Sequence, residues 1–366
     1  MAVRNPFAED FDPAAEPPRR PSSPPPSVPL GGGDTLTPFD DGWVAPEPEP
    51  EAVKLPLITE PGAYPDIDAE DYHGNPLLLP EPSLSSSGAK MLLNKSPFHF
   101  WANSLLNPNR PARPERPHFA VGRMAHDLVL LPDRDIGEFY HVLPQGFAWN
   151  KTIQFECEIE EAKAAREEGK TLIKFDDAAI ARAAAESLRR HELAMACLTN
   201  GVTEETLVWK DEETGVWLRA RPDFRPHSIV DRLETRVVAD LKFVAETSIT
   251  PEGFSKHIHR YGYHITAAMY WEGIEKIHGV APTHWVHVPI EKDFPFCAEV
   301  YPLPMEDIER GKQQVRRAVR KFADCLSKDK WPSHTSAELK EVGLPIYARM
   351  NHDNNDPDEA AFAAAS

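Results

Sequence analysis

The chain has 366 residues and a formal net charge of −18, with 41% hydrophobic and 27% charged residues. This balance is typical of a soluble globular protein and allows one large domain or two. No stretch approaches the ~18 apolar residues of a transmembrane helix, and the N-terminus lacks an apolar signal segment, so we expect neither a membrane span nor a secretory signal. The four cysteines lie far apart without a Cys-x-x-Cys pair. This argues against a zinc ribbon, an iron–sulfur cluster or a disulfide scaffold and favours a reduced, cytoplasmic protein.

Proline and acidic residues dominate the first part of the chain. Thirteen of the 37 prolines fall in residues 1–50, and residues 1–72 hold fifteen acidic but only four basic side chains. Such a segment buries too little apolar surface to offset its conformational entropy. We therefore predict a disordered acidic arm over residues 1–72 and a second disordered acidic tail over 351–366. The remaining residues, 73–350, carry a net charge of only −3, which is compatible with a polyanionic partner.

From residue 83 the sequence pattern indicates helices. Residues 83–105 begin with capping serines and are interrupted by Pro97, so we expect two short helices there. Further helices are predicted by periodicity and by Ala, Glu and Arg content at 122–131, 156–168 and 176–198.

The second half of the chain alternates between strands and helices. β-Branched and aromatic runs bounded by turn residues predict strands at 206–210, 216–221, 236–243, 283–290 and 297–303. Helical periodicity predicts one long helix at 252–278 and an amphipathic helix at 306–326. This order predicts a single α/β domain over residues 73–350.

Two short motifs bring carboxylates and a lysine to neighbouring strands. Pro222-Asp223 ends one predicted strand, and Asp240-Leu241-Lys242 lies in the next. Asp240 and Lys242 are two residues apart and therefore share one face of their strand. Two carboxylates suited to Mg²⁺ and one lysine can then converge, which suits metal-assisted phosphodiester hydrolysis. The alternative is a surface Asp–Lys pair on a β-ribbon.

Several further blocks extend the pattern along the chain, in a specific order: Leu84–Gly88, Ser96–Phe100, Gly122–His126, Glu204–Trp209, Arg219–Phe224, Ala239–Lys242 and Tyr261–Tyr270. On these blocks the sequence from about Ser83 to Tyr347 resembles the PD-(D/E)XK nuclease superfamily, and within it the phage RecE-like exonucleases. The resemblance implies a restriction-endonuclease-like fold, in which a mixed β-sheet is flanked by helices.

The resemblance also implies roles for individual residues. Asp223 and Asp240 match metal-binding carboxylates, the Leu241 carbonyl a third ligand, and Lys242 the catalytic lysine. His126 matches a helical histidine that serves as a metal ligand; a core-facing helix histidine is the alternative. A further acidic residue of the site corresponds to Glu204, although its neighbour Glu205 leaves the register open.

Candidate DNA contacts come from two regions. Arg219 and Arg221 flank the proposed site. Tyr263, Thr266 and Tyr270 share one helix face, where tyrosines could touch a phosphate or stack on a base, or else pack against the sheet. Thr266 stands where relatives often have Gln. The basic residues of the last helix, Arg316, Arg317, Arg320 and Lys321, could hold phosphates, but a solvated polar face is favoured.

The function implied is Mg²⁺-dependent exonucleolytic cleavage of linear double-stranded DNA, with Mn²⁺ substituting. The resemblance further implies 5′-to-3′ resection that leaves 3′ single strands for a RecT-like annealing protein, a homo-oligomeric ring, and a phage-encoded protein in the host cytoplasm. An endonuclease or single-strand nuclease of the same fold, and a non-catalytic scaffold that recruits partners through its Pro-rich arm, are the alternatives. The acidic arm could also mimic DNA or restrain the entrance to the site.

Overall fold

The computed structural model describes residues 56–111, 117–146, 160–226, 236–245, 249–334 and 341–346. Most of the predicted arm and the whole predicted C-terminal tail lie outside these ranges, as does the start of the helix predicted at 156–168. Within the described ranges, no helix combines the length and the apolar character that a membrane crossing needs.

The described chain alternates between helices and short strands. Its helices are α1 (Ala69–Gly74), α2 (Ser86–Asn94), α3 (Pro97–Asn103), α4 (Pro117–Leu130), α5 (Ile136–Phe139), α6 (Glu160–Glu167), α7 (Phe175–Arg189), α8 (Glu192–Cys197), α9 (Pro251–Tyr261), α10 (Tyr263–His278) and α11 (Met305–Lys328). Its strands are β1 (Gly62–Tyr64), β2 (Ser83–Ser85), β3 (Tyr140–Val142), β4 (Thr171–Ile173), β5 (Gly201–Thr203), β6 (Thr206–Lys210), β7 (Trp217–Ala220), β8 (Phe224–Pro226), β9 (Val237–Val244), β10 (His284–Glu291) and β11 (Tyr301–Pro302).

Two mixed sheets form the frame of the domain. The first has the order β1-β6-β7-β2 and the second β11-β10-β9-β8-β5, while β3 and β4 pair separately. In the second sheet β9 runs parallel to β10 and antiparallel to β8. The predicted mixed sheet flanked by helices is confirmed as an architecture, with its strands divided between two sheets.

A bent hairpin runs from one sheet into the other. Its first arm passes from β5 into β6 through Glu204, whose φ of 52° breaks the extended backbone. Its second arm passes from β7 into β8 through residues 221–223. The Glu204 amide donates to the Asp223 carbonyl at 3.2 Å, so the two breaks face each other. Acidic side chains that the sequence singled out therefore lie where the chain leaves one sheet for the other.

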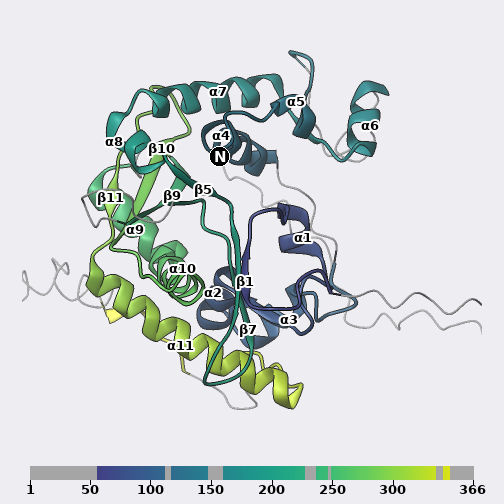
Figure 1. Cartoon of the computed structure of the whole chain (residues 1–366), viewed down its shortest axis with the longest axis vertical. Helices are drawn as coiled ribbons and strands as arrows, with labels where there is room; N and C mark the ends of the chain where they lie inside the picture. Colours follow the sequence, from purple (N-terminus) through teal and green to yellow (C-terminus); the bar gives the residue numbers. More distant parts are fainter. Residues whose placement is uncertain are drawn as a thin grey trace, which may run out of the picture. The chain divides into compact units, whose positions relative to one another are not determined.

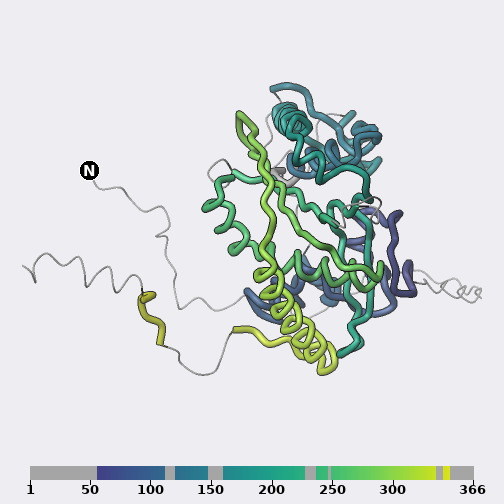
Figure 2. Tube along the Cα trace, turned by 60° about the vertical axis from the view of Figure 1, so that its left-hand side comes forward, coloured from purple at the N-terminus to yellow at the C-terminus, as the bar shows by residue number. Residues whose placement is uncertain are grey.

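Helices cover the two sheets in separate groups (Figure 1). α10 packs against the first sheet, and α2 and α11 lie beside it, with a core of Trp209, Trp271, Leu92 and Phe322. The tube view in Figure 2 shows the same arrangement from another side. Phe100 of α3 also packs edge-on against Phe322 of α11, with ring centroids 5.5 Å apart. α7 and α8 pack on the second sheet, and α4 packs against α7.

The N-terminal boundary predicted at residue 72 is wrong, because residues 56–72 belong to the folded domain. β1 pairs antiparallel with β6, and α1 is capped by the Asp68 carboxylate. Ile58 and Tyr72 are 1% and 3% exposed and pack with Trp217. The prediction averaged composition over residues 1–72, where acidic residues and prolines dominate, and so it overlooked the few apolar residues that are buried.

Other boundaries differ locally. The helix predicted at 252–278 is two helices, because Gly262 adopts a φ of 63° that ends α9 and begins α10. The helix predicted at 176–198 is likewise divided, with His191 capping α8. The strand predicted at 297–303 is reduced to Tyr301–Pro302 and an isolated bridge at Ala298, although further backbone hydrogen bonds of Cys297, Glu299 and Leu303 also reach β10. The interruption predicted at Pro97 is confirmed, with Ser85 and Ser96 capping α2 and α3.

Candidate active site

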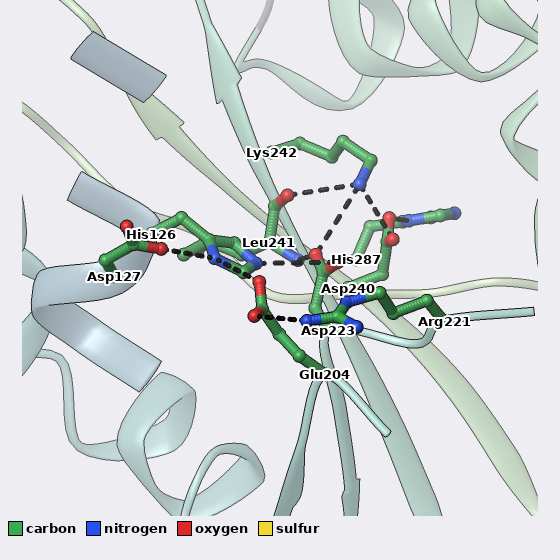
Figure 3. Close-up of polar contacts among 9 residues, drawn as sticks. All are labelled: His126, Asp127, Glu204, Arg221, Asp223, Asp240, Leu241, Lys242 and His287. Atoms are coloured by element: carbon green, nitrogen blue, oxygen red, sulfur yellow. Dashed lines mark hydrogen bonds and ion pairs between the residues drawn. The ribbon is translucent and has the colours of Figure 1, made fainter. Parts of the chain in front are cut away.

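Strand β9 presents Asp240 and Lys242 on one face, as their spacing predicts. The Lys242 ammonium lies 2.7 Å from Asp240 Oδ1 and 3.7 Å from Asp223 Oδ2, and it donates to the Leu241 carbonyl at 3.1 Å. Asp223, placed just before β8, accepts the Leu241 amide at 2.9 Å. The residues of both motifs therefore meet at one point of the sheet (Figure 3).

Helix α4 brings His126 to the same point. Its Nε2 lies 3.5 Å from Asp223 Oδ1, and its Nδ1 lies 3.5 Å from Glu204 Oε1 and 3.6 Å from Asp127 Oδ1. Burial alone would lower the pKa of His126, but Asp223, Asp127 and Glu204 outweigh burial and raise the pKa to about 10. His126 therefore faces the acidic cluster rather than an apolar core.

The two neighbouring glutamates face different partners. Glu204 lies beside His126, and its Oε2 accepts Arg221 Nη2 at 3.0 Å. Glu205 accepts Arg225 through two bonds of 2.8 and 3.0 Å and lies 3.0 Å from His278 Nε2. Burial would raise the pKa of Glu205, but the His278 and Arg225 hydrogen bonds lower it to about 2. Of the two glutamates between which the sequence could not decide, Glu204 lies beside His126 and Glu205 does not.

The oxygens at this point suit a hard divalent cation. Asp240 Oδ1, the Leu241 carbonyl and Asp223 Oδ2 already surround one cation, the Lys242 ammonium. Carboxylate and carbonyl oxygens are preferred ligands of Mg²⁺, and an imidazole also accepts Mn²⁺. A second, overlapping group consists of His126, Asp127 and Glu204, whose ligand atoms lie within 4.8 Å of one another. The residues present therefore fit a metal centre.

The two arginines predicted to contact DNA are half-buried and lie against protein groups. Arg221 is committed internally, to Glu204, to Thr206 Oγ1 at 3.1 Å and to the Ile67 carbonyl, and Arg219 lies over the Tyr72 ring at 5.1 Å.

The three residues predicted on one helix face have different surroundings. The Tyr263 ring lies 5.5 Å from Lys242 Nζ, and burial raises its pKa to about 12. Tyr270 packs edge-on against Trp285 at 6.1 Å, and burial raises its pKa well above its usual range. Thr266 is 9% exposed, and its hydroxyl accepts Lys90 Nζ at 3.0 Å. Only Tyr263 of the three therefore lies directly against Lys242.

The basic residues of α11 mostly bind protein groups. Arg316 bonds Asp211, Arg320 bonds Glu213 through distances of 2.6 and 3.1 Å, and Lys321 donates to the Leu92 carbonyl at 3.2 Å. Arg317, Arg320 and Lys321 are nevertheless exposed and Arg316 is partly buried, which agrees with the solvated polar face favoured from the sequence.

His287 is a residue of the site that sequence reasoning missed. It lies on β10 directly opposite Asp240 and is fully buried, with Nδ1 3.0 Å from Asp240 Oδ2. Its Nε2 makes no hydrogen bond within the described part of the chain and lies among the rings of Phe254, Tyr263 and Trp285. Nδ1–H can therefore hold one carboxylate oxygen of Asp240, while Oδ1 faces Lys242. In the sequence, the only sign of this role is a histidine within an apolar strand. The pairing with Asp240 becomes visible only once the register between β9 and β10 is known.

Comparisons with known proteins agree with this geometry. Residues 85–340 match the model of the family described as PDDEXK-like domain of unknown function (DUF3799). A solved structure from Eubacterium rectale, described as a "Putative exonuclease", has a TM-score of 0.51 and 13% sequence identity, and the alignment covers 80% of this chain and 98% of that chain. At this identity the likeness shows a shared fold. No curated protein matches the chain.

Proposed function

The chain belongs to the PDDEXK-like family (DUF3799), and on that premise we propose that it is a divalent-metal-dependent exodeoxyribonuclease acting on linear double-stranded DNA. One observation carries the proposal: Asp240, the Leu241 carbonyl and Asp223 converge on the Lys242 ammonium, with oxygens 2.7, 3.1 and 3.7 Å from its Nζ. This is the combination that metal-assisted phosphodiester hydrolysis requires. A surface Asp–Lys pair would not be expected to have Asp240 only 2% exposed.

Asp223, Asp240, the Leu241 carbonyl and His126 would hold the metal. When bound there, a divalent cation supplies positive charge that activates water and withdraws electron density from a phosphate. Glu204 and Asp127 contact His126 from its Nδ1 side, so they can orient the ring with Nε2 toward Asp223. Tyr140 in turn donates to Asp127 at 2.7 Å and Arg221 to Glu204, which fixes both carboxylates.

Lys242 acts as a permanent positive charge. Burial would lower the pKa of its ammonium, but Asp240 and Asp223 raise the pKa above its ordinary value. The group therefore stays protonated at neutral pH and serves as a hydrogen-bond donor rather than a base. In the reaction it would stabilise the negative charge that develops on the phosphate and its leaving oxygen.

The finer features are also proposals, and the family resemblance supports them. We propose Mg²⁺ as the metal, a 5′-to-3′ direction, and 3′ single strands passed to an annealing protein of the RecT type. A ring of subunits would let the enzyme stay on its substrate, and the reaction would take place in the cytoplasm of a phage host.

A nuclease assay with Mg²⁺ tests the proposal. Linear duplex DNA carries a 5′ label in one sample and a 3′ label in a second, and covalently closed circular DNA is the topological control. Lys242→Ala is the inactive variant. Lys276→Ala is its matched control, because Lys276 is an exposed lysine that bonds Glu212 outside the site. We expect early release of the 5′ label from linear DNA, lost in Lys242→Ala and kept in Lys276→Ala.

Other outcomes identify the alternatives. Nicked circles indicate an endonuclease, and faster digestion of single strands indicates a single-strand nuclease. No cleavage with either Mg²⁺ or Mn²⁺ would refute the enzymatic proposal and favour a non-catalytic scaffold.

A further inference from the structure

We propose that Lys90 of α2, positioned by Thr266, binds a backbone phosphate of the DNA beside the catalytic centre. This inference rests on the proposed function, since it places a contact with the same substrate. Neither the family description nor the structural comparison assigns a role to Lys90.

The Lys90 side chain is fixed along its length. Its stem lies against Gly262, where an added Cβ would lie 3.0 Å from Lys90 Cδ and 3.3 Å from Cγ. Gly262 is the positive-φ residue between α9 and α10, so the helix break provides the space that the stem occupies. At its end, Nζ donates to Thr266 Oγ1 at 3.0 Å. Two residues outside its own helix, Gly262 and Thr266, therefore fix the position of the ammonium.

The ammonium lies within electrostatic reach of the catalytic centre. Lys242 repels it and Asp240 attracts it, which places it near both residues. Thr266 follows Tyr263 by about one turn of α10, and the Tyr263 ring lies 5.5 Å from Lys242 Nζ. A backbone phosphate bound by Lys90 would therefore lie next to the phosphodiester bond that is cleaved beside Lys242.

The charge of Lys90 is poorly compensated. An ammonium has three donors, but among the described residues Lys90 bonds only the neutral hydroxyl of Thr266 and forms no ion pair with a carboxylate. Burial, with Lys242 adding to it, lowers the Lys90 pKa to about 8, although Asp240 partly opposes the shift. A partly buried cation without an anion is costly to keep, which is typical of a site whose anion arrives with the ligand. The anion that the proposed substrate carries is a phosphodiester.

Thr266 acts through Lys90 in this arrangement. Its side chain is 9% exposed and its hydroxyl is occupied by Lys90, so Thr266 is a positioning residue. Many lysines pack their apolar stem on the protein and extend the ammonium into water. A lysine of that kind would need no hydroxyl partner such as Thr266.

The salt dependence of DNA binding tests the proposal. Affinity for a short duplex is measured in EDTA, where no cleavage occurs, over a series of salt concentrations. Lys90→Met keeps the stem and removes the charge. Lys95→Met is the matched control, since Lys95 is exposed at the end of the same helix and carries the same charge.

Loss of one phosphate contact should reduce the slope of log affinity against log salt by about 0.9. This corresponds to roughly eightfold weaker binding at 0.1 M salt, vanishing toward 1 M. We expect that change in Lys90→Met and not in Lys95→Met. Thr266→Val should weaken binding less, because the ammonium remains but loses its aim. An unchanged slope in Lys90→Met, or an equal change in Lys95→Met, would overturn the proposal.

Thermal unfolding separates this role from a structural one. Replacing an unpaired, partly buried cation with methionine should leave the melting temperature unchanged or raise it, whereas a structural contact would lower it.

The cleavage assay separates this proposal from the nuclease itself. If the wild type cleaves DNA but Lys90→Met leaves the salt slope of binding unchanged, only the Lys90 proposal is refuted. A protein that binds through Lys90 without cleaving refutes the nuclease alone, and a protein that binds no DNA at low salt refutes both.

Discussion

Lys242→Met should destabilise the metal-free protein, and a divalent cation should restore much of that stability without restoring activity. In the structure the Lys242 ammonium lies 2.7 Å from Asp240 and 3.7 Å from Asp223, so its charge offsets theirs. The Asp240 side chain is only 3% exposed, so removal of the ammonium leaves a buried carboxylate that keeps, among the described residues, only its contact with His287. The cation should then replace the lost ammonium.

The magnitude follows from the burial of the three groups. Breaking a buried ion pair costs about 3–5 kcal/mol. The lower end applies here, because the Lys242 and Asp223 side chains are 22% and 20% exposed. A loss of about 3 kcal/mol corresponds to a melting temperature lower by roughly 6–10 °C for a domain of this size. A cation at 100 times its dissociation constant would return about 2.7 kcal/mol.

Thermal unfolding in EDTA and in saturating MgCl₂ measures both effects, with the exposed Lys276→Met as the control. The cation-induced shift should be larger in Lys242→Met than in the wild type, where the cation competes with the ammonium. Equal shifts in the two proteins, or no loss of stability in EDTA, would show that Lys242 does not occupy the cation-binding point.

Three further results are expected. His287→Leu should weaken Mn²⁺ binding by about 10–100-fold, measured by electron paramagnetic resonance, because Asp240 loses the hydrogen bond that orients it. His287→Asn keeps a hydrogen-bond donor and should recover part of the lost affinity. Equal losses in the two variants would argue against this hydrogen bond. Glu205→Gln should cost about 3 kcal/mol in urea unfolding at pH 7, since the pKa is lowered to about 2, and the difference should shrink as pH falls from 4.5 toward 2. In EDTA, His126→Asn should be less stable than the wild type at pH 7. The two stabilities should converge as pH rises through about 10, because a raised pKa stabilises the fold only while the imidazole is protonated. A stability difference that persists above that pH would contradict the pairing with Asp223.

The part of the site that could be predicted from the sequence is the part with local periodicity. Asp240 and Lys242 share a face because side chains alternate along a strand, and Asp223 follows from the antiparallel neighbour. His287 could not be found in this way, since it meets Asp240 through parallel pairing of strands 47 residues apart. Register between distant strands is set by tertiary packing and leaves no local pattern.

Backbone conformation explains the other differences. The positive φ of Glu204 decides which of two adjacent glutamates faces His126, and helix or strand periodicity does not encode such a break. Gly262 within a helical pattern is compatible with a continuous helix, although the structure uses its positive φ to divide the helix and make room for Lys90.

The pairing of β1 with β6 determines how the acidic N-terminus can be removed. β1 lies at the edge of its sheet and covers β6, whose Leu207, Val208 and Trp209 are almost fully buried. A protein that began at residue 73 would expose the unpaired backbone of an apolar strand, which is a template for aggregation. Truncation before residue 56 spares that pair. An insoluble product from the longer deletion would thus report on a stripped sheet edge and carry no information about whether the acidic segment competes with DNA.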